Sequence, residues 1–204
     1  MKNKEFEAWI TSKGNTLSEL CVETKDRTVR CFIPCEVGKP FEIHWRDNGS
    51  KKFTAGYIYV DGFACPGRYL QGSGETFRAG ARSGPTTERP FVFVPITPGS
   101  DGLAPNMSVG SIILKIMETE RGPGRPANKV EHLPAYVASQ TDSAKTGGAC
   151  VAFGAPEIHG FEQSPFTWST KPINPSWNHS YVKFEFKYRT REWLQQQGML
   201  PRDP

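Results

Sequence analysis

Residues 180–188, with the sequence SYVKFEFKY, decide the fold class of this chain. Large apolar and aromatic side chains alternate with polar or charged ones along the stretch. One face would carry Val182, Phe184, Phe186 and Tyr188. A period of two is typical of a β-strand that has one face in a core and the other in water. The stretch therefore predicts a half-buried strand, and the rest of the chain can be interpreted outward from it.

The residues that follow this strand predict a short helix over residues 190–197. Thr190 can cap the free N–H groups of a first turn, and Glu192 suits the positive end of a helix. Gly198 is placed to end the helix in a left-handed conformation. Because a helix this short is unstable alone in water, we expect Trp193 and Leu194 to dock it on the sheet.

Toward the N-terminus, further short runs of strand-forming residues are separated by turn formers. The turn dipeptides Asn48-Gly49 and Asp61-Gly62 are the strongest of these signals. No long amphipathic helix lies between the runs, which argues against βαβ units. The pattern predicts an all-β fold, a single antiparallel β-sandwich of about seven to nine strands, jelly-roll-like or immunoglobulin-like. The runs cover residues 6–10, 28–33, 39–45, 53–60, 75–82, 89–96 and 109–117.

Residues 119–178 interrupt this pattern within a domain that we expect to span residues 1–204. The segment begins with the Gly- and Pro-rich sequence RGPGRPAN at 121–128 and continues with few bulky apolar residues. We expect a largely irregular loop region with one short strand at 149–153. The run 28–33 is expected to end at Pro34.

Composition limits the possible functions further. The chain has 204 residues, a hydrophobic fraction of 37%, 20 Gly and 17 Pro. This is enough apolar material for a core, and no apolar run approaches the ~18 residues that a membrane helix needs. A net charge of +4 is too small to require a nucleic-acid partner. The five Cys and the absence of a secretory signal at the N-terminus predict reduced thiols and a cytoplasmic or nuclear, non-secreted protein.

Several of these segments together resemble an uncharacterised domain family of unknown function that is found mainly in mushroom-forming fungi. The resemblance implies a β-rich domain, a fungal source and an intracellular location, and it implies no catalytic residue. The segments that carry it are FEAWI at 6–10, CFIPCEVGKPFEIHW at 31–45, VDG at 60–62, RPFVF at 89–93, GSIILKI at 110–116, FEFKYR at 184–189 and LP at 200–201.

The sequence predicts no metal site and no cofactor. Cys31 and Cys35 lack the second closely spaced Cys or His pair that a zinc site needs. The enzyme alternative is a small Cys/His hydrolase, in which Cys150 would be the nucleophile and His159 or His179 its base. The competing interpretation is that Cys150 is an ordinary buried thiol.

A basic loop at 121–129 supports a second alternative, a nucleic-acid-associated protein. Arg121, Arg125 and Lys129 would contact phosphates, and Gly124-Arg125-Pro126 is the core tripeptide of AT-hook-like arms. Pro123 stands where a full hook has a first Arg, so a solvated loop stiffened by Pro is the preferred interpretation of the segment.

Two aromatic groups complete the candidates. Trp168 and Trp177 lie in the irregular segment and could form a carbohydrate platform or pin the loop. Trp45 is expected in the core, whereas Trp9 lies opposite Phe6 and Ile10 and is a candidate contact on an exposed face. The preferred function is a non-enzymatic interaction or assembly module, with a protein partner or a second copy of itself.

Overall fold

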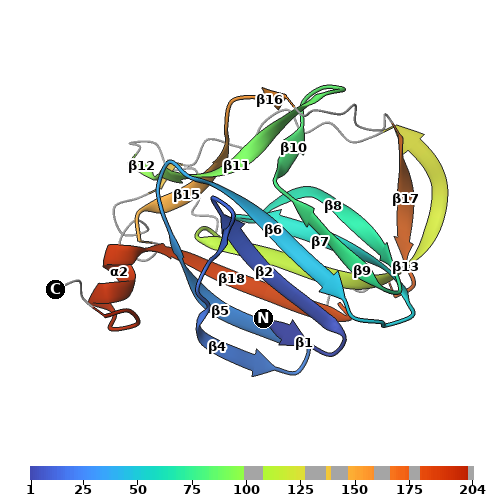
Figure 1. The fold of residues 1–204 in the computed structure, drawn as a ribbon, viewed down its shortest axis with the longest axis horizontal. Coiled ribbons are helices and arrows are strands. Elements are labelled where there is room, and N and C mark those ends of the chain that lie inside the picture. Colours follow the sequence, from blue (N-terminus) through green and yellow to red (C-terminus); the bar gives the residue numbers. More distant parts are fainter. Residues whose placement is uncertain (99–107, 127–136, 139–146, 159–165, 175–179, 202–204) are drawn as a thin grey trace.

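A computed structural model of the chain describes residues 1–98, 108–126, 137–138, 147–158, 166–174 and 180–201. Two β-sheets pack face to face in it, with one short helix at the C-terminal end (Figure 1). The predicted all-β sandwich is confirmed. In the described residues the sheets have nine and seven strands, so the sequence underestimated the number of strands.

The two sheets draw strands from all along the chain. The nine-stranded sheet contains β1 (Lys2–Asn3), β2 (Phe6–Ser12), β3 (Asn15–Thr16), β6 (Pro40–Asp47), β9 (Gly74–Arg78), β10 (Gly80–Arg82), β11 (Thr87–Pro95), β15 (Ala149–Phe153) and β16 (Glu157–Ile158). The seven-stranded sheet contains β4 (Leu20–Lys25), β5 (Thr28–Cys35), β7 (Phe53–Val60), β8 (Phe63–Gln71), β13 (Ser111–Pro126), β17 (Phe166–Pro172) and β18 (Val182–Thr190). A further small pair joins β12 (Thr97–Pro98) to β14 (Val137–Ala138).

The stretch that decided the fold class becomes β18, a central strand of the seven-stranded sheet. It lies between β5 and β13 in the order β4-β5-β18-β13-β7-β8. Its four alternating large side chains, from Val182 to Tyr188, are all fully buried. They meet the inward-facing residues of the other sheet, among them Trp45, Phe41 and Phe91. The alternation therefore reports burial correctly, and Trp45 is in the core as predicted.

The pairing of β18 corrects the expectation of a purely antiparallel sandwich. β18 runs parallel to β5, from Lys183 opposite Thr28 to Thr190 opposite Cys35. The expectation that Pro34 ends β5 is also wrong. β4 pairs with β5 only as far as Phe32, so Pro34 lies beyond the end of that neighbour, where its missing N–H costs no ladder bond on that side.

The largest strand missed by sequence is β8, which pairs with β7 through the Asp61-Gly62 hairpin. The pairing shifts register between Gly56 and Ile58, where Pro66 and Gly67 form the irregularity in β8. A Cβ on Gly67 would lie 1.7 Å from the carbonyl oxygen of Gly56, so only Gly fits there. Pro and Gly are tolerated because β8 is an edge strand with a bulge.

The segment 119–178 contains more strand than the sequence predicted. The expected strand at 149–153 is β15, which pairs with β11. In addition, β13 continues to Pro126, and its distal half pairs with β17. We call this two-stranded extension, residues 119–126 of β13 with β17, the β-arm; Figure 1 shows it rising at the right of the sheets.

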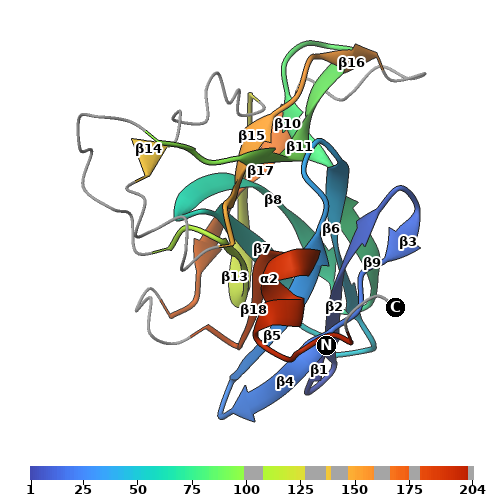
Figure 2. The same cartoon turned by 90° about the vertical axis from the view of Figure 1, so that its left-hand side faces the viewer.

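The predicted C-terminal helix is confirmed as α2 (Arg191–Gln196). Thr190 is its N-cap and accepts a hydrogen bond from the backbone N–H of Trp193 at 3.4 Å. Gly198 has a φ of 71°, and the N–H of Met199 bonds back to Leu194, as in a Schellman C-cap. Leu194 is fully buried, and Trp193 stacks on Phe32 of β5, so the helix packs on one end of the seven-stranded sheet (Figure 2).

Candidate interaction face

Three aromatic rings from separate strands form a row on the outer face of the nine-stranded sheet. Trp9 on β2 is the register partner of His44 on β6, and His44 is the partner of Phe77 on β9. The ring centroids are 5.4 Å apart for Trp9 and His44 and 5.2 Å apart for His44 and Phe77. These residues face outward because their neighbours Ala8, Ile10, Ile43 and Trp45 fill the core. We call the three rings the ring ladder.

The geometry of the ring ladder limits what it can bind. Its planes are inclined by only 13° and 21° to one another. Nearly parallel rings at these separations are offset-stacked, so their faces meet each other and their edges face solvent. The guanidinium carbons of Arg46 and Arg68 lie 5.4 Å and 5.6 Å from the ring centroids of Trp9 and Phe77. The ring ladder therefore presents ring edges to solvent, and it lacks the open ring face on which a sugar would stack.

A row of side chains with alternating charge runs beside the ring ladder. On β2, β6 and β9 the charged residue lies two positions from the ring, and the row continues onto β1. Lys2 on β1, Glu7 on β2, Arg46 on β6 and Glu75 on β9 are successive register partners. Neighbouring charges lie 3.4 Å apart for Lys2 and Glu7, 3.9 Å for Glu7 and Arg46, and 2.9 Å for the Nε of Arg46 and Glu75. The hydrogen bond to Glu75 raises the pKa of Arg46. We call these four residues the charge row.

On its other side, the ring ladder is held by a small polar group. The Nε2 atom of His44 lies 2.9 Å from a carboxylate oxygen of Glu42. The hydroxyl of Thr11 lies 3.1 Å from the same nitrogen and 3.3 Å from the same carboxylate oxygen. These contacts orient the central ring without any partner, which lowers the entropy that binding would cost at this position.

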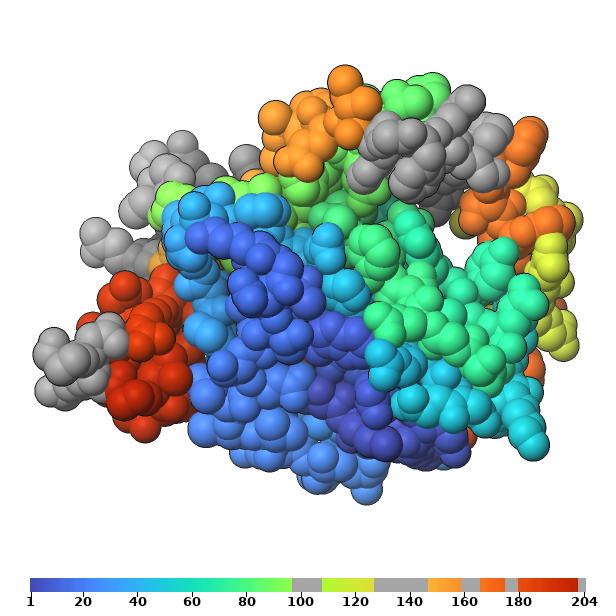
Figure 3. Space-filling view, in the orientation of Figure 1, coloured from blue at the N-terminus to red at the C-terminus, as the bar shows by residue number. Residues whose placement is uncertain are grey.

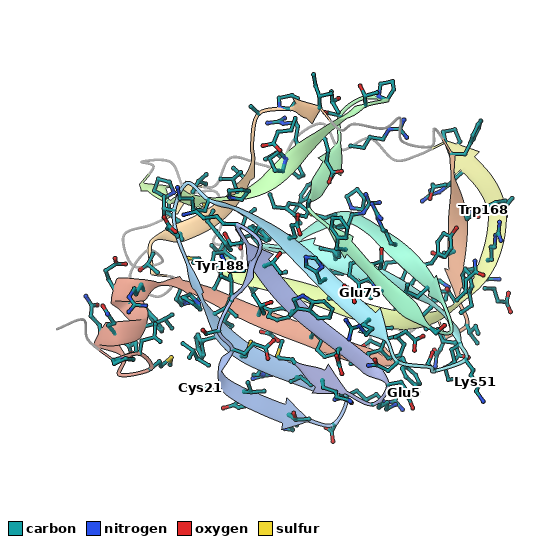
Figure 4. The ribbon with its side chains drawn as sticks, viewed as in Figure 1. Glu5, Cys21, Lys51, Glu75, Trp168 and Tyr188 are labelled. Atoms are coloured by element: carbon teal, nitrogen blue, oxygen red, sulfur yellow. The ribbon has the colours of Figure 1, made fainter. Side chains whose placement is uncertain are left out.

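The ring ladder and the charge row together make up what we call the interaction face. Strands β2, β6 and β9 form much of the front surface in Figure 3, and Figure 4 places Glu75 near its middle. Phe77 is 42% exposed, and Trp9 is partly exposed. The sequence identified Trp9 as an outward-facing residue, and its role as a contact remains a prediction. His44 and Phe77 were missed, although His44 alternates with the buried residues Ile43 and Trp45.

The proposed nucleophile Cys150 lies in a different place, on β15, where it packs with Ile96 in a small apolar cluster apart from the main core. It is 3% exposed, and its Sγ lies 3.8 Å from the carbonyl oxygen of Pro95. Burial, together with the charge of Asp61, raises the pKa of Cys150 to about 11. The thiol is therefore protonated at neutral pH, whereas a nucleophilic Cys needs its thiolate. The proposed bases His159 and His179 lie outside the described residues.

The five thiols give a direct prediction. Cys21 is exposed, whereas burial raises the pKa of Cys31, Cys35 and Cys65 to about 12. Alkylation of the native protein without reductant should label Cys21 rapidly, and denaturation should release the other four thiols. Mass spectrometry measures both stages. Cys31 and Cys35 are four residues apart on β5, about 13 Å, so recovery of a disulfide between them would contradict the fold.

Two of the three proposed nucleic-acid residues, Arg121 and Arg125, lie on the β-arm rather than on a loop. The guanidinium carbon of Arg121 lies 3.5 Å from the ring centroid of Trp168, which Figure 4 shows on β17. Arg125 is exposed and pairs in register with Thr167. Because Gly124-Arg125-Pro126 is part of a two-stranded ribbon, it is not the thin single arm of an AT-hook-like element. Lys129 and Trp177 lie outside the described residues.

The most elaborate buried polar site is centred on Asp61, at the hairpin turn between β7 and β8. Its carboxylate accepts hydrogen bonds from the backbone N–H groups of Gly110, Ser111 and Val151 at 2.8, 3.3 and 2.9 Å. The hydroxyl of Tyr188 donates to it at 2.5 Å. These donors come from the start of β13, from β15 and from β18, so the carboxylate joins both sheets. We interpret this site as structural, because its acceptor oxygens are occupied by the fold.

Asp61 should make stability depend on pH. Burial raises its pKa from 3.8 to about 6, although its hydrogen bonds act in the opposite direction. The folded chain thus holds this proton more tightly than the unfolded chain. Its contribution to the free energy of unfolding should fall by about 3 kcal/mol as the pH rises from about 4 to about 6. Urea unfolding of wild type and Asp61→Asn over pH 4–7 measures the difference, which should shrink with pH; a constant difference would contradict the assignment.

Two kinds of feature are absent from the part of the chain that the structure describes, namely a metal-binding cluster and a membrane-spanning helix. There, His, Cys, Asp and Glu side chains form no group of three that could hold a metal ion. No helix among these residues has the length and apolar character needed to cross a membrane.

Comparison with known proteins gives one match. A family model described as a domain of unknown function, DUF7918, matches residues 5–203. No curated protein and no solved structure matches the chain. The predicted resemblance to an uncharacterised family is confirmed at this level.

Proposed function

We propose, from the premise that the chain belongs to the DUF7918 family of unknown function, that it is a non-enzymatic assembly module. It binds another folded protein through the interaction face. The observation that carries the proposal is the ring ladder itself, in which three rings from distant parts of the chain are aligned by strand register and left at the surface. Its free thiols fit a cytoplasmic or nuclear location.

The composition of the interaction face suits protein binding. Trp and Arg are enriched among the residues that dominate binding free energies, and Trp9, Arg46 and Phe77 lie together here. Side chains that are already held by stacking and ion pairs lose little conformational entropy when a partner docks. The charge row beside them would fix the register of that partner.

The two alternatives have less support. The hydrolase alternative needs a reactive Cys150, but this thiol is buried and its pKa is raised. The nucleic-acid alternative needs free cations, but Arg121 is stacked on Trp168, and Lys171 is the register partner of Glu120. The described residues of the β-arm carry three cations, Arg121, Arg125 and Lys171, against one anion, Glu120, and this net charge of +2 would support only a few phosphate contacts.

The native size of the protein in fresh lysates of cells that express it tests the proposal. By size-exclusion chromatography with immunodetection, wild type should elute as a complex well above 22.7 kDa. Phe77→Asp should elute as the free chain, because a charge replaces an exposed ring of the face. Val22→Asp is the matched control, since Val22 is 51% exposed on β4 in the other sheet, and it should elute like wild type.

Both variants must melt at the wild-type temperature for the comparison to count, and Arg46→Glu is the substitute if Phe77→Asp melts lower. A wild-type chain that elutes alone would overturn the proposal. So would a complex that persists in the folded variants of the interaction face.

A further inference from the structure

This inference rests on the proposed function and names the partner. We propose that the interaction face binds the same face of a second copy of the chain, about a twofold axis that runs parallel to the strands between β2 and β6. The charge row carries the argument, because its four residues occupy four adjacent strands in the order Lys2, Glu7, Arg46, Glu75.

The order of signs makes the charge row self-complementary. Adjacent strands are about 4.8 Å apart, so the four charges are evenly spaced and read plus, minus, plus, minus. A twofold axis at the centre of the row reverses this order in the second copy. Lys2 then lies opposite the partner's Glu75, and Glu7 lies opposite the partner's Arg46. All four positions meet the opposite sign, as a closed symmetric interface requires.

The same charges exclude the neighbouring position of the axis. An axis centred on β6 would place Arg46 against the partner's Arg46 and Glu7 against the partner's Glu75, which repel. With the axis between β2 and β6, Trp9 instead lies opposite the partner's His44. Two twisted sheets cross at about 30°, so the pairs nearest the axis meet most closely. The contact of Glu7 with the partner's Arg46 is therefore the decisive one.

A second copy fits this face better than a strongly charged partner does. The charge row has two cations and two anions, so it exerts no net attraction on a polyanion or a polycation. The face is four strands wide, roughly 20 Å, but β1 contributes only two residues and β9 five, so the face is small for a specific interface. We therefore expect a reversible dimer that forms in the micromolar range.

Charge reversal at the two central positions tests the geometry with purified full-length protein. Glu7→Arg alone places like charges at both central contacts of a dimer, and so does Arg46→Glu alone. Each variant should dissociate at least about tenfold more readily than wild type. In an equimolar mixture, a Glu7→Arg chain facing an Arg46→Glu chain has opposite signs at all four positions. Sedimentation velocity should then show a heterodimer with a Kd within about threefold of the wild-type value.

A control and the salt dependence complete the test. Glu23→Arg reverses an exposed charge on β4 of the other sheet and should leave the Kd unchanged. Added salt should weaken the wild-type dimer, because it screens the ion pairs between the two charge rows. If the wild-type protein stays monomeric at several hundred micromolar, the partner is not a second copy of the chain. This result would leave the proposed function intact if Phe77→Asp still dissociates the complex in lysates. A wild-type dimer that survives both single reversals, or a mixture that stays monomeric, overturns the proposed axis.

Discussion

Replacing Asp61 with alanine should lower the free energy of unfolding by about 4–6 kcal/mol. The substitution removes the acceptor for three backbone N–H groups and for the hydroxyl of Tyr188, all buried between the sheets. Each buried donor left without a partner costs about 1–3 kcal/mol. Asp61 also has a φ of 51°, which alanine adopts less readily than Asp or Asn. Urea denaturation followed by circular dichroism measures the change.

Asp47→Ala is the matched control for this experiment. Asp47 is also buried, but its acceptors serve only Gly49 and Ser50, within three residues of its own position. Its loss should cost about 1–2 kcal/mol, because a local turn is affected and no strands are disconnected. If Asp61→Ala does not fold, Asp61→Asn gives a smaller loss in the same direction. Equal losses at the two positions would contradict the linking role of Asp61.

Ending the chain at Thr190 should lower the free energy of unfolding by about 4–5 kcal/mol. The truncation removes the fully buried Leu194 and the ring of Trp193 that stacks on Phe32. A buried Leu replaced by alanine typically costs about 2–5 kcal/mol, and a Trp that leaves a sheet adds to this. Leu194→Ala in the full chain should therefore account for at least half of the effect. Thermal and urea unfolding of the three chains measures each part.

Gln196→Ala provides the comparison within α2, because Gln196 is exposed on the same helix. It should change the free energy of unfolding by less than about 0.5 kcal/mol. A truncated chain that unfolds like wild type would show that α2 is merely appended to the sheet.

Runs of strand-forming residues bounded by turn signals were predicted correctly from sequence, whereas several strands interrupted by Pro or Gly were missed. The run at 53–60 is β7, with the predicted bounds, and the run at 180–188 is β18 to within two residues. In β8, Pro66 and Gly67 break the pattern because they form a bulge at a sheet edge. The distal part of β13 was missed for a similar reason, since Gly122 and Gly124 lie within it. An alternating sequence indicates a strand with one buried face. A bulge in an edge strand interrupts that alternation, so the sequence pattern does not indicate the strand.

The interaction face could be predicted only in part. The alternation of residues 6–10 was enough to place Trp9 on the face opposite the core. Its neighbours in the ring ladder depend on the register of β2, β6 and β9, which are far apart in sequence. The parallel pairing of β18 with β5 was hidden for the same reason, because strand direction depends on the path of the whole chain. The Asn48-Gly49 turn illustrates this, because it joins β6 and β7, which belong to different sheets.

The parallel pair also determines when the sheet can form during synthesis. Synthesis of β5 precedes that of its partner β18 by about 150 residues. At about 5–20 residues per second, roughly 10–30 s pass between them. During that interval the backbone edge of β5 lacks the strand with which it pairs. Its apolar side chains Val29, Cys31 and Ile33 also lack the neighbours that β18 will provide. The seven-stranded sheet therefore cannot be completed before β18 is made, and a contact of such large sequence separation is expected to slow folding. The yield of native protein should depend on chaperones that hold the earlier strands until β18 has been made.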